Sequence, residues 1–254
     1  MGKMSDEELV KKLEHYERVE NFWMLVVLPG IVLSGLIGLV GKQVILGTGL
    51  FFICLFGCLI VGKGAGKKKK ALIHEQLQDF FQSELEYAFG PEQHQPEFLI
   101  DEAHIRYQGF FQADWEECEI ENAYEGVYKG KDFSAANVVL RHVYKVKTGQ
   151  AEYEKRSVDV FKGLWVIFGT AHNVTRRTCI SEKIITELEN AVSGRLEASA
   201  WEKNRLVLAI STEHRFADIP ETASVHDIDG LRRSFTHSLR GVKELLDVLI
   251  QENV

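Results

Sequence analysis

The chain has 254 residues, enough for one or two domains, and a formal net charge of -7. Residues 1–70 contain ten Lys/Arg and six Asp/Glu, whereas residues 71–254 contain twenty Lys/Arg and thirty-one Asp/Glu. Because phosphate backbones are bound by clustered Lys/Arg, the acidic C-terminal part argues against nucleic acid as a partner. The four cysteines form neither a CxxC pair nor a secreted disulfide spacing, which favours a reducing compartment.

The N-terminal sixty residues are dominated by two runs without charge. Ser5-Asp6-Glu7-Glu8 has the form of a capping box, so residues 1–21 are predicted to form a cytoplasmic helix. Residues 22–40 and 44–61 then contain no charged side chain, and as helices each run would span about 27 Å, close to the thickness of a hydrocarbon core. Three residues separate the runs, which indicates a tight transmembrane hairpin over 22–61. The alternative is a pair of buried core helices, which rarely go so far without a charge.

The distribution of Lys and Arg around the runs predicts an orientation. Lys42 is the one basic residue in the turn, whereas several basic residues flank each outer end. Because Lys and Arg stay on the cytoplasmic side, we expect a multi-pass protein of the cell (inner) membrane with both termini in the cytoplasm. The basic residues after the second run are placed to contact the anionic leaflet of the lipid bilayer, although they could simply fix the topology: Lys63, Lys67, Lys68, Lys69 and Lys70.

Small residues recur every four positions on the first run, at Gly30, Ser34 and Gly38. This spacing allows close approach of helix backbones. It suits packing of the first span on the second, or packing between copies in a homo-oligomer formed through the hairpin. Neither run contains an ionisable residue, which favours an anchor over a channel or transporter.

Two short stretches resemble parts of nucleotide-binding motifs. GCLIVGKG (57–64) approaches the phosphate loop GxxxxGK[ST], but Gly64 lacks the hydroxyl that binds Mg²⁺, and the stretch completes a predicted span. Asp101-Glu102-Ala103-His104 spells the DEAH motif of helicases. A helicase core needs two tandem nucleotide-binding domains and an acidic pair at the end of a strand, neither of which fits here. We expect instead a short amphipathic helix with Asp101, Glu102 and Arg106 facing water, held by four residues at helical spacing: Leu99, Ile100, Ala103 and Tyr107.

The rest of the chain predicts an α+β fold. Residues 62–90 form a basic exit followed by an amphipathic helix over 71–89, which Gly90-Pro91 ends. Residues 91–254 are predicted to form a cytoplasmic α+β domain with strands at 119–130, 136–149, 157–170, 173–180 and 204–211. Ser181 begins a helix over 181–194 that stops at Gly194, and Asp227 or Asp229 caps one long last helix. Grouped strands with helices at the ends indicate a mostly antiparallel sheet with flanking helices.

Three stretches carry a family resemblance: Gln108-Gly109-Phe110-Phe111, Tyr128-Lys129-Gly130-Lys131-Asp132-Phe133 and Val160-Phe161-Lys162-Gly163-Leu164-Trp165-Val166. With the overall layout, they resemble a family of uncharacterised bacterial membrane proteins, a domain of unknown function. The resemblance implies an N-terminal transmembrane hairpin followed by a cytoplasmic α+β domain. It also implies a possible association with LemA-type membrane proteins, and it supplies no catalytic residues.

The sequence contains no recognisable catalytic constellation. The nine histidines show no HExxH or HxH spacing, no GxSxG elbow occurs, and no catalytic, metal or cofactor-binding residue is predicted. Cys118 lies between Glu117 and Glu119, so its pKa is expected to be raised, which disfavours a nucleophile. Phe161-Lys162-Gly163 is interpreted as a close backbone approach or a bulge rather than a ligand site. The sequence therefore favours a membrane-anchored cytoplasmic interaction or sensing module. The alternative is a membrane-proximal enzyme whose site is dispersed in the sequence.

Overall fold

The computed structural model describes residues 4–19, 64, 68–69, 71–93, 95–147, 153–170, 180–219 and 227–252. The chain divides into two compact units, one made of residues 1–80 with 223–232 and the other of residues 81–222 with 233–254. Within the described ranges, none of the helices is both long enough and apolar enough to cross a membrane. The predicted spans 22–40 and 44–61 lie outside the described residues.

The described residues of the first unit are mostly helical and include several buried apolar side chains. Residues 6–19 are helical, and the predicted capping box is confirmed: the Glu8 amide donates to Ser5 Oγ at 3.3 Å, and the Ser5 amide donates to Glu8 Oε2 at 3.4 Å. Arg232 forms an ion pair of 3.1 Å with Asp6. The buried side chains of this unit recur at helical spacing: Leu9, Leu13, Ile73, Leu77, Ile228 and Leu231.

The second unit contains a five-stranded antiparallel sheet with strand order β1-β2-β3-β5-β4. The strands are β1 (Glu117–Tyr128), β2 (Lys131–Lys147), β3 (Tyr153–Gly169), β4 (Arg195–Glu202) and β5 (Arg205–Ser211). Lys129 and Gly130, with φ of 50° and 81°, form the two-residue turn between β1 and β2. The α+β class and the antiparallel sheet with flanking helices are thus confirmed.

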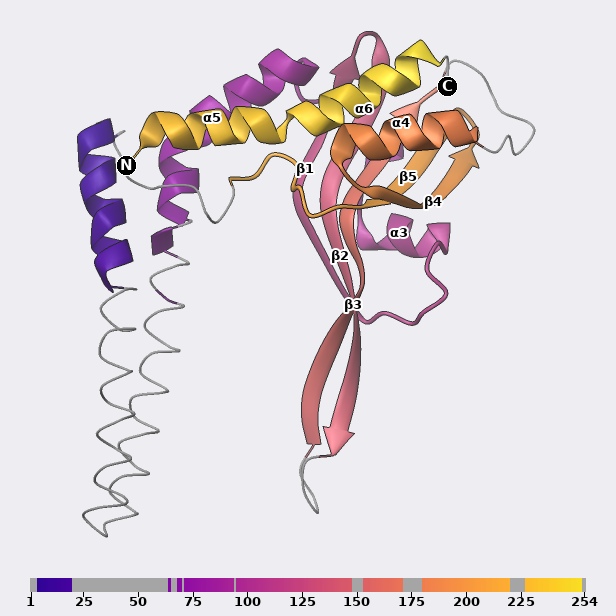
Figure 1. Ribbon diagram of the computed structural model, residues 1–254, viewed down its shortest axis with the longest axis horizontal. Helices are drawn as coiled ribbons and strands as arrows, with labels where there is room; N and C mark the ends of the chain where they lie inside the picture. Colours follow the sequence, from indigo (N-terminus) through magenta and orange to yellow (C-terminus); the bar gives the residue numbers. More distant parts are fainter. Residues whose placement is uncertain are drawn as a thin grey trace. The chain divides into compact units, whose positions relative to one another are not determined.

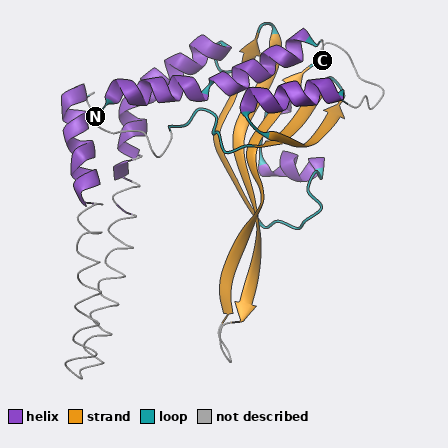
Figure 2. Cartoon of the chain, in the orientation of Figure 1, coloured by secondary structure: helices purple, strands orange, loops and turns teal. Residues whose placement is uncertain are grey.

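Helices and loops cover the two faces of this sheet (Figures 1 and 2). On one face, α3 (Glu102–Gln108) and the segments around it pack on Phe161, Trp165 and Ile167 of β3. On the other lie α4 (Glu182–Val192) and α6 (Arg240–Gln251), with α5 (Ile228–Ser238) leading into α6. Leu164, Val166 and Phe168 alternate with the first set and are also buried. Burial on both faces explains why this part of β3 reads as a continuous apolar run.

The helix over 71–89 ends as predicted. Gly90 has φ of 81°, and its amide donates to the Glu86 carbonyl at 2.8 Å. Phe89 is buried in the second unit among the rings of Tyr124, Tyr128 and Phe133. The end of this helix therefore belongs to the core of the sheet domain.

The prediction for the DEAH segment was right about the helix and about the buried side chain of Ile100, which is 6% exposed, and wrong about the other three residues of the buried face. Asp101 is the N-cap, and its carboxylate accepts a hydrogen bond of 2.7 Å from the His104 amide. Tyr107 and Leu99 are 79% and 49% exposed and Ala103 is also exposed, whereas Ile105 is 2% exposed. The helix starts only at Glu102, so Leu99 and Ile100 precede it in extended backbone, and their spacing to Tyr107 is not that of one helix face.

Other boundaries differ from those predicted. The sequence analysis missed β4, and the strand predicted at 173–180 lies almost entirely outside the described residues. The last helix is two helices, because the chain breaks at Leu239 between α5 and α6. Ser181 caps α4 as predicted, but Ser193 rather than Gly194 adopts the left-handed conformation at its end, with φ of 49°.

Candidate functional site

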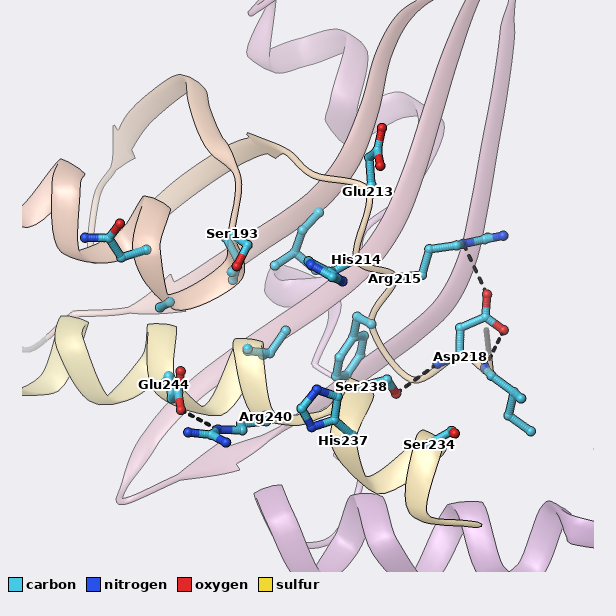
Figure 3. Close-up of a pocket in the computed structure, with 18 of the residues that line it drawn as sticks. Ser193, Glu213, His214, Arg215, Asp218, Ser234, His237, Ser238, Arg240 and Glu244 are labelled. Carbon is cyan, nitrogen blue, oxygen red and sulfur yellow. Dashed lines mark hydrogen bonds and ion pairs between the residues drawn. The ribbon is translucent and has the colours of Figure 1, made fainter. Parts of the chain in front are cut away.

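A cleft with a volume of about 930 Å³ lies on the helical face of the sheet domain (Figure 3). Its walls come from the end of α4, the loop that follows β5, and the junction of α5 and α6. The buried side chains of Leu164, Val192, Phe216 and Val242 contribute apolar surface to it. The cleft is lined by polar and apolar side chains in similar measure and is large enough for a small ligand or a peptide side chain.

The loop of residues 212–219 is tied to the surrounding helices at two points. The buried hydroxyl of Thr212 donates to the Val192 carbonyl at the end of α4, at 3.0 Å. Farther along, the Asp218 amide donates to Ser238 Oγ at the end of α5, at 3.2 Å. These bonds hold both ends of the loop against the helices that form the opposite walls, so the cleft has a defined shape.

The middle of the loop is fixed by a buried side chain of the sheet. Asn137 of β2 is 5% exposed. Its Oδ1 accepts from the Phe216 amide at 2.8 Å, and its Nδ2 donates to the Phe216 carbonyl at 2.7 Å. Asn122, which adopts φ of 52° at the irregularity in β1, donates to the same carbonyl at 3.2 Å. Asn137 therefore satisfies both backbone groups of a buried loop residue, as buried polar groups require.

Several charged side chains around the cleft form ion pairs with other residues of the protein. Arg240 bonds to Glu244 at 2.6 Å, and Arg215 bonds to Asp218 at 3.2 Å and also pairs with Glu121 of β1. The dashed lines in Figure 3 mark the first two of these pairs. These groups support the walls and offer only part of their bonding capacity to a ligand.

Four other lining residues carry ionisable side chains without a partner in the described part of the chain. Lys162, Glu213, His214 and His237 are exposed, and none of their side chains forms a hydrogen bond or ion pair within the described part of the chain. Lys162 comes from β3, Glu213 and His214 from the loop after β5, and His237 from α5. Figure 3 shows the two histidines on the same cleft although they are 23 residues apart in the sequence. They can accept or donate hydrogen bonds to a bound group.

The cleft presents these groups without an assembled nucleophile and base. Within the described lining, the hydroxyl, carboxylate and imidazole groups form no hydrogen-bonded chain of nucleophile, base and orienting group of the kind used in covalent catalysis. Among the residues that the structure describes, no group of three or more His, Cys, Asp or Glu side chains is arranged to hold a metal ion. The arrangement is suited to recognition through mixed polar and apolar contacts.

Sequence reasoning did not identify this cleft. The spacing of His214 and His237 in the sequence indicates no common site, and Asn137 lies in the middle of a strand. A polar Asn in the run Ala135-Ala136-Asn137-Val138-Val139 was the available signal, because a buried amide needs partners. Lys162 was noted only for its position beside Gly163.

The residues predicted for membrane contact and helix packing are mostly outside the described ranges. Lys68 and Lys69 are helical, with Lys68 exposed, whereas Lys63, Lys67 and Lys70 are not described. Gly30, Ser34 and Gly38 are not described either. The phosphate-loop-like stretch 57–64 is described only at Gly64, which is helical.

Two further residue predictions can be compared with the structure. The pKa of the Cys118 thiol is raised to about 11, mainly by burial and secondarily by the charge of Glu102. The predicted direction is right, but the predicted cause, the charges of the flanking Glu117 and Glu119, is wrong. Gly163 is a close backbone approach as predicted, because a Cβ there would overlap the carbonyl oxygen of Ile210 on β5. In the DEAH segment, burial lowers the pKa of His104, and Glu102 pairs with Arg106 at 2.8 Å.

No protein-family model, no curated protein and no solved structure matches the chain. The functional argument therefore depends on the residues of the chain themselves.

Proposed function

We propose that this protein is a membrane-anchored cytoplasmic module that recognises or senses a partner. The charge-free runs 22–40 and 44–61 support the anchor, since each has the length of a membrane span. Lys63 and Lys67 to Lys70 follow the second run, as expected where a chain enters the cytoplasm of a bacterial cell through the inner membrane. In this proposal both termini and the sheet domain are cytoplasmic.

The recognition site in this proposal is the cleft of the sheet domain. The observation that carries it is the set of four ionisable side chains without a partner in the described chain, Lys162, Glu213, His214 and His237, on a cleft that is also lined by apolar residues. Exposed charges of both signs select a partner by complementarity, and the apolar lining supplies the affinity. A protein segment with an apolar side chain flanked by charges of both signs meets these requirements.

The family resemblance indicates where a partner can first be sought. A LemA-type membrane protein is the leading candidate. Self-association through Gly30, Ser34 and Gly38 is compatible with the same role, because it would present several clefts on one membrane surface.

The proposal is tested by affinity capture of the tagged full-length protein from native membranes. The test variant is Lys162→Glu combined with Glu213→Lys, which reverses both free charges of the cleft and keeps the net charge. The matched control is Lys203→Glu combined with Glu97→Lys, which changes two exposed residues that do not line the cleft. We expect one partner to be captured by the wild type and the control and to be lost from the cleft variant. Equal recovery with the cleft variant, or absence of the protein from the membrane fraction, would refute the proposal.

A further inference from the structure

The hairpin of β2 and β3 extends beyond the other strands as a two-stranded ribbon (Figure 1). β1 pairs with β2 only up to Arg141, and β5 pairs with β3 only from Gly163 onward. Residues 142–147 and 153–158 are therefore paired with each other and with no other strand in the described chain. This distal part of the hairpin is called the arm below. An isolated ribbon contributes little to a core, so its side chains are available for another purpose.

Lysines gather on one face of the arm. Lys145 lies directly opposite Lys155, and Lys147 lies opposite Tyr153. Directly opposed residues share a face, as do residues two apart on one strand, so these four side chains lie on the same side of the ribbon. Tyr153 is 65% exposed. The face thus combines three cations with one exposed aromatic ring.

The other face of the arm is nearly neutral and more apolar. It carries His142, Tyr144 and Val146 opposite Val158, Arg156 and Glu154. Arg156 and Glu154 neutralise each other through an ion pair of 2.9 Å, and the rings of His142 and Tyr144 stack with centroids 6.0 Å apart. The unbalanced positive charge of the arm is thereby confined to the lysine face.

Within the described residues, the domain neutralises one of these three lysines and leaves the other two. Lys155 bonds to Glu117 of β1 at 2.9 Å, but neither Lys145 nor Lys147 has an ion-pair partner within the described residues. Like charges directly opposite each other destabilise a pair of strands. A surface of negative charge outside the chain would remove this repulsion.

We propose that the lysine face of the arm binds the anionic phospholipid headgroups of the membrane in which the chain is anchored. This inference rests on the proposed membrane anchor, which brings the domain within reach of such a surface. An acidic domain is repelled by an anionic leaflet, whereas each lysine near the surface is attracted to it. The arm is a basic segment in an acidic domain, so its contact sets which side of the domain faces the bilayer. Tyr153 suits the headgroup region, where amphipathic rings accumulate.

The test uses the full-length protein with photoreactive benzoyl-phenylalanine in place of Tyr153, reconstituted into vesicles. The vesicles contain either phosphatidylcholine alone or phosphatidylcholine with phosphatidylserine, and cross-linked products are identified by mass. We expect lipid adducts in the vesicles with phosphatidylserine, and far fewer in the neutral vesicles or at high salt. Lys145→Gln with Lys147→Gln should reduce the adducts about tenfold or more. Lys203→Gln with Lys243→Gln, the same charge change elsewhere on the domain, should leave them unchanged.

Three results would overturn the inference: no adduct, equal adducts in both kinds of vesicle, or cross-links between two protein chains. The last would identify a second copy as the occupant of the arm. Extraction of the same vesicles with alkaline carbonate separates this inference from the proposed anchor. Release of a protein that had formed charge-dependent adducts would refute the anchor alone, whereas retention without adducts would refute the arm contact alone.

Discussion

Replacing Asn137 by Ala should loosen the loop that forms one wall of the cleft. Asn137 holds the amide and the carbonyl of Phe216 with bonds of 2.8 and 2.7 Å, and Phe216 is 2% exposed. In Asn137→Ala the amide loses its side-chain partner, and the carbonyl keeps only the bond of 3.2 Å from Asn122. An unsatisfied buried group costs about 1–3 kcal/mol, and a lost hydrogen bond about 1 kcal/mol more. The free energy of unfolding should therefore fall by about 2–4 kcal/mol.

Asn122→Gly is the matched control for this experiment. It removes one hydrogen bond to the same carbonyl, and glycine tolerates the positive φ of 52° found at this position. The loss of stability should be about 1 kcal/mol or less. Denaturant unfolding of the full-length protein in detergent gives both values, and hydrogen exchange reports the Phe216 amide directly. If Asn137→Ala is no more destabilising than Asn122→Gly and leaves exchange at Phe216 unchanged, the proposed support of the loop is wrong.

Three other variants or titrations follow from the structure. Gly163→Ala should destabilise the protein by about 3 kcal/mol or more, because the added methyl group would overlap the Ile210 backbone. The neighbouring control Lys162→Ala should change the melting temperature little, and similar melting temperatures for the two variants would contradict the close approach. Cys118, with a pKa of about 11, should be alkylated slowly by iodoacetamide at pH 8, and the rate should rise about tenfold for each pH unit up to pH 10. Mass spectrometry of the Cys118 peptide gives the rate, and a rate that levels off near pH 9 would show an ordinary thiol. The pKa of His104 in the folded protein is below 6.5, so the unfolded chain is protonated first and the free energy of unfolding should fall as the pH decreases from 6.5 toward the folded pKa. His104→Gln should make the free energy of unfolding less dependent on pH in this range. An unchanged pH dependence would exclude a contribution from His104.

Local patterns predicted those elements whose signals are local. The capping box at Ser5 and the caps at Ser181 and Gly90 depend on residues within a few positions of one another, and all three are present. The apolar stripe of the last two helices is likewise buried throughout, from Leu231 to Leu249. The break between the two helices at Leu239 could not be predicted from the sequence, because the helical spacing of apolar residues continues across it.

Features that depend on tertiary contacts were missed. β4 contains Glu197, Ala198, Ser199 and Ala200, which give little strand propensity, and it exists because it pairs with β5 at the edge of the sheet. The cleft could not be predicted for a related reason. His214 and His237 lie on one cleft because Thr212, Asn137 and Ser238 fix the loop of residues 212–219. These partners are separated by as many as 79 residues, so no spacing rule connects them.

The central claim is that the chain is held in the membrane by residues 22–61. Alkaline carbonate extraction of membranes from cells that produce the tagged full-length protein tests it most directly, with a variant lacking residues 22–61 as the control. The proposal predicts that the full-length protein stays in the membrane pellet and that the deletion variant is released. Release of the full-length protein into the carbonate supernatant would contradict it.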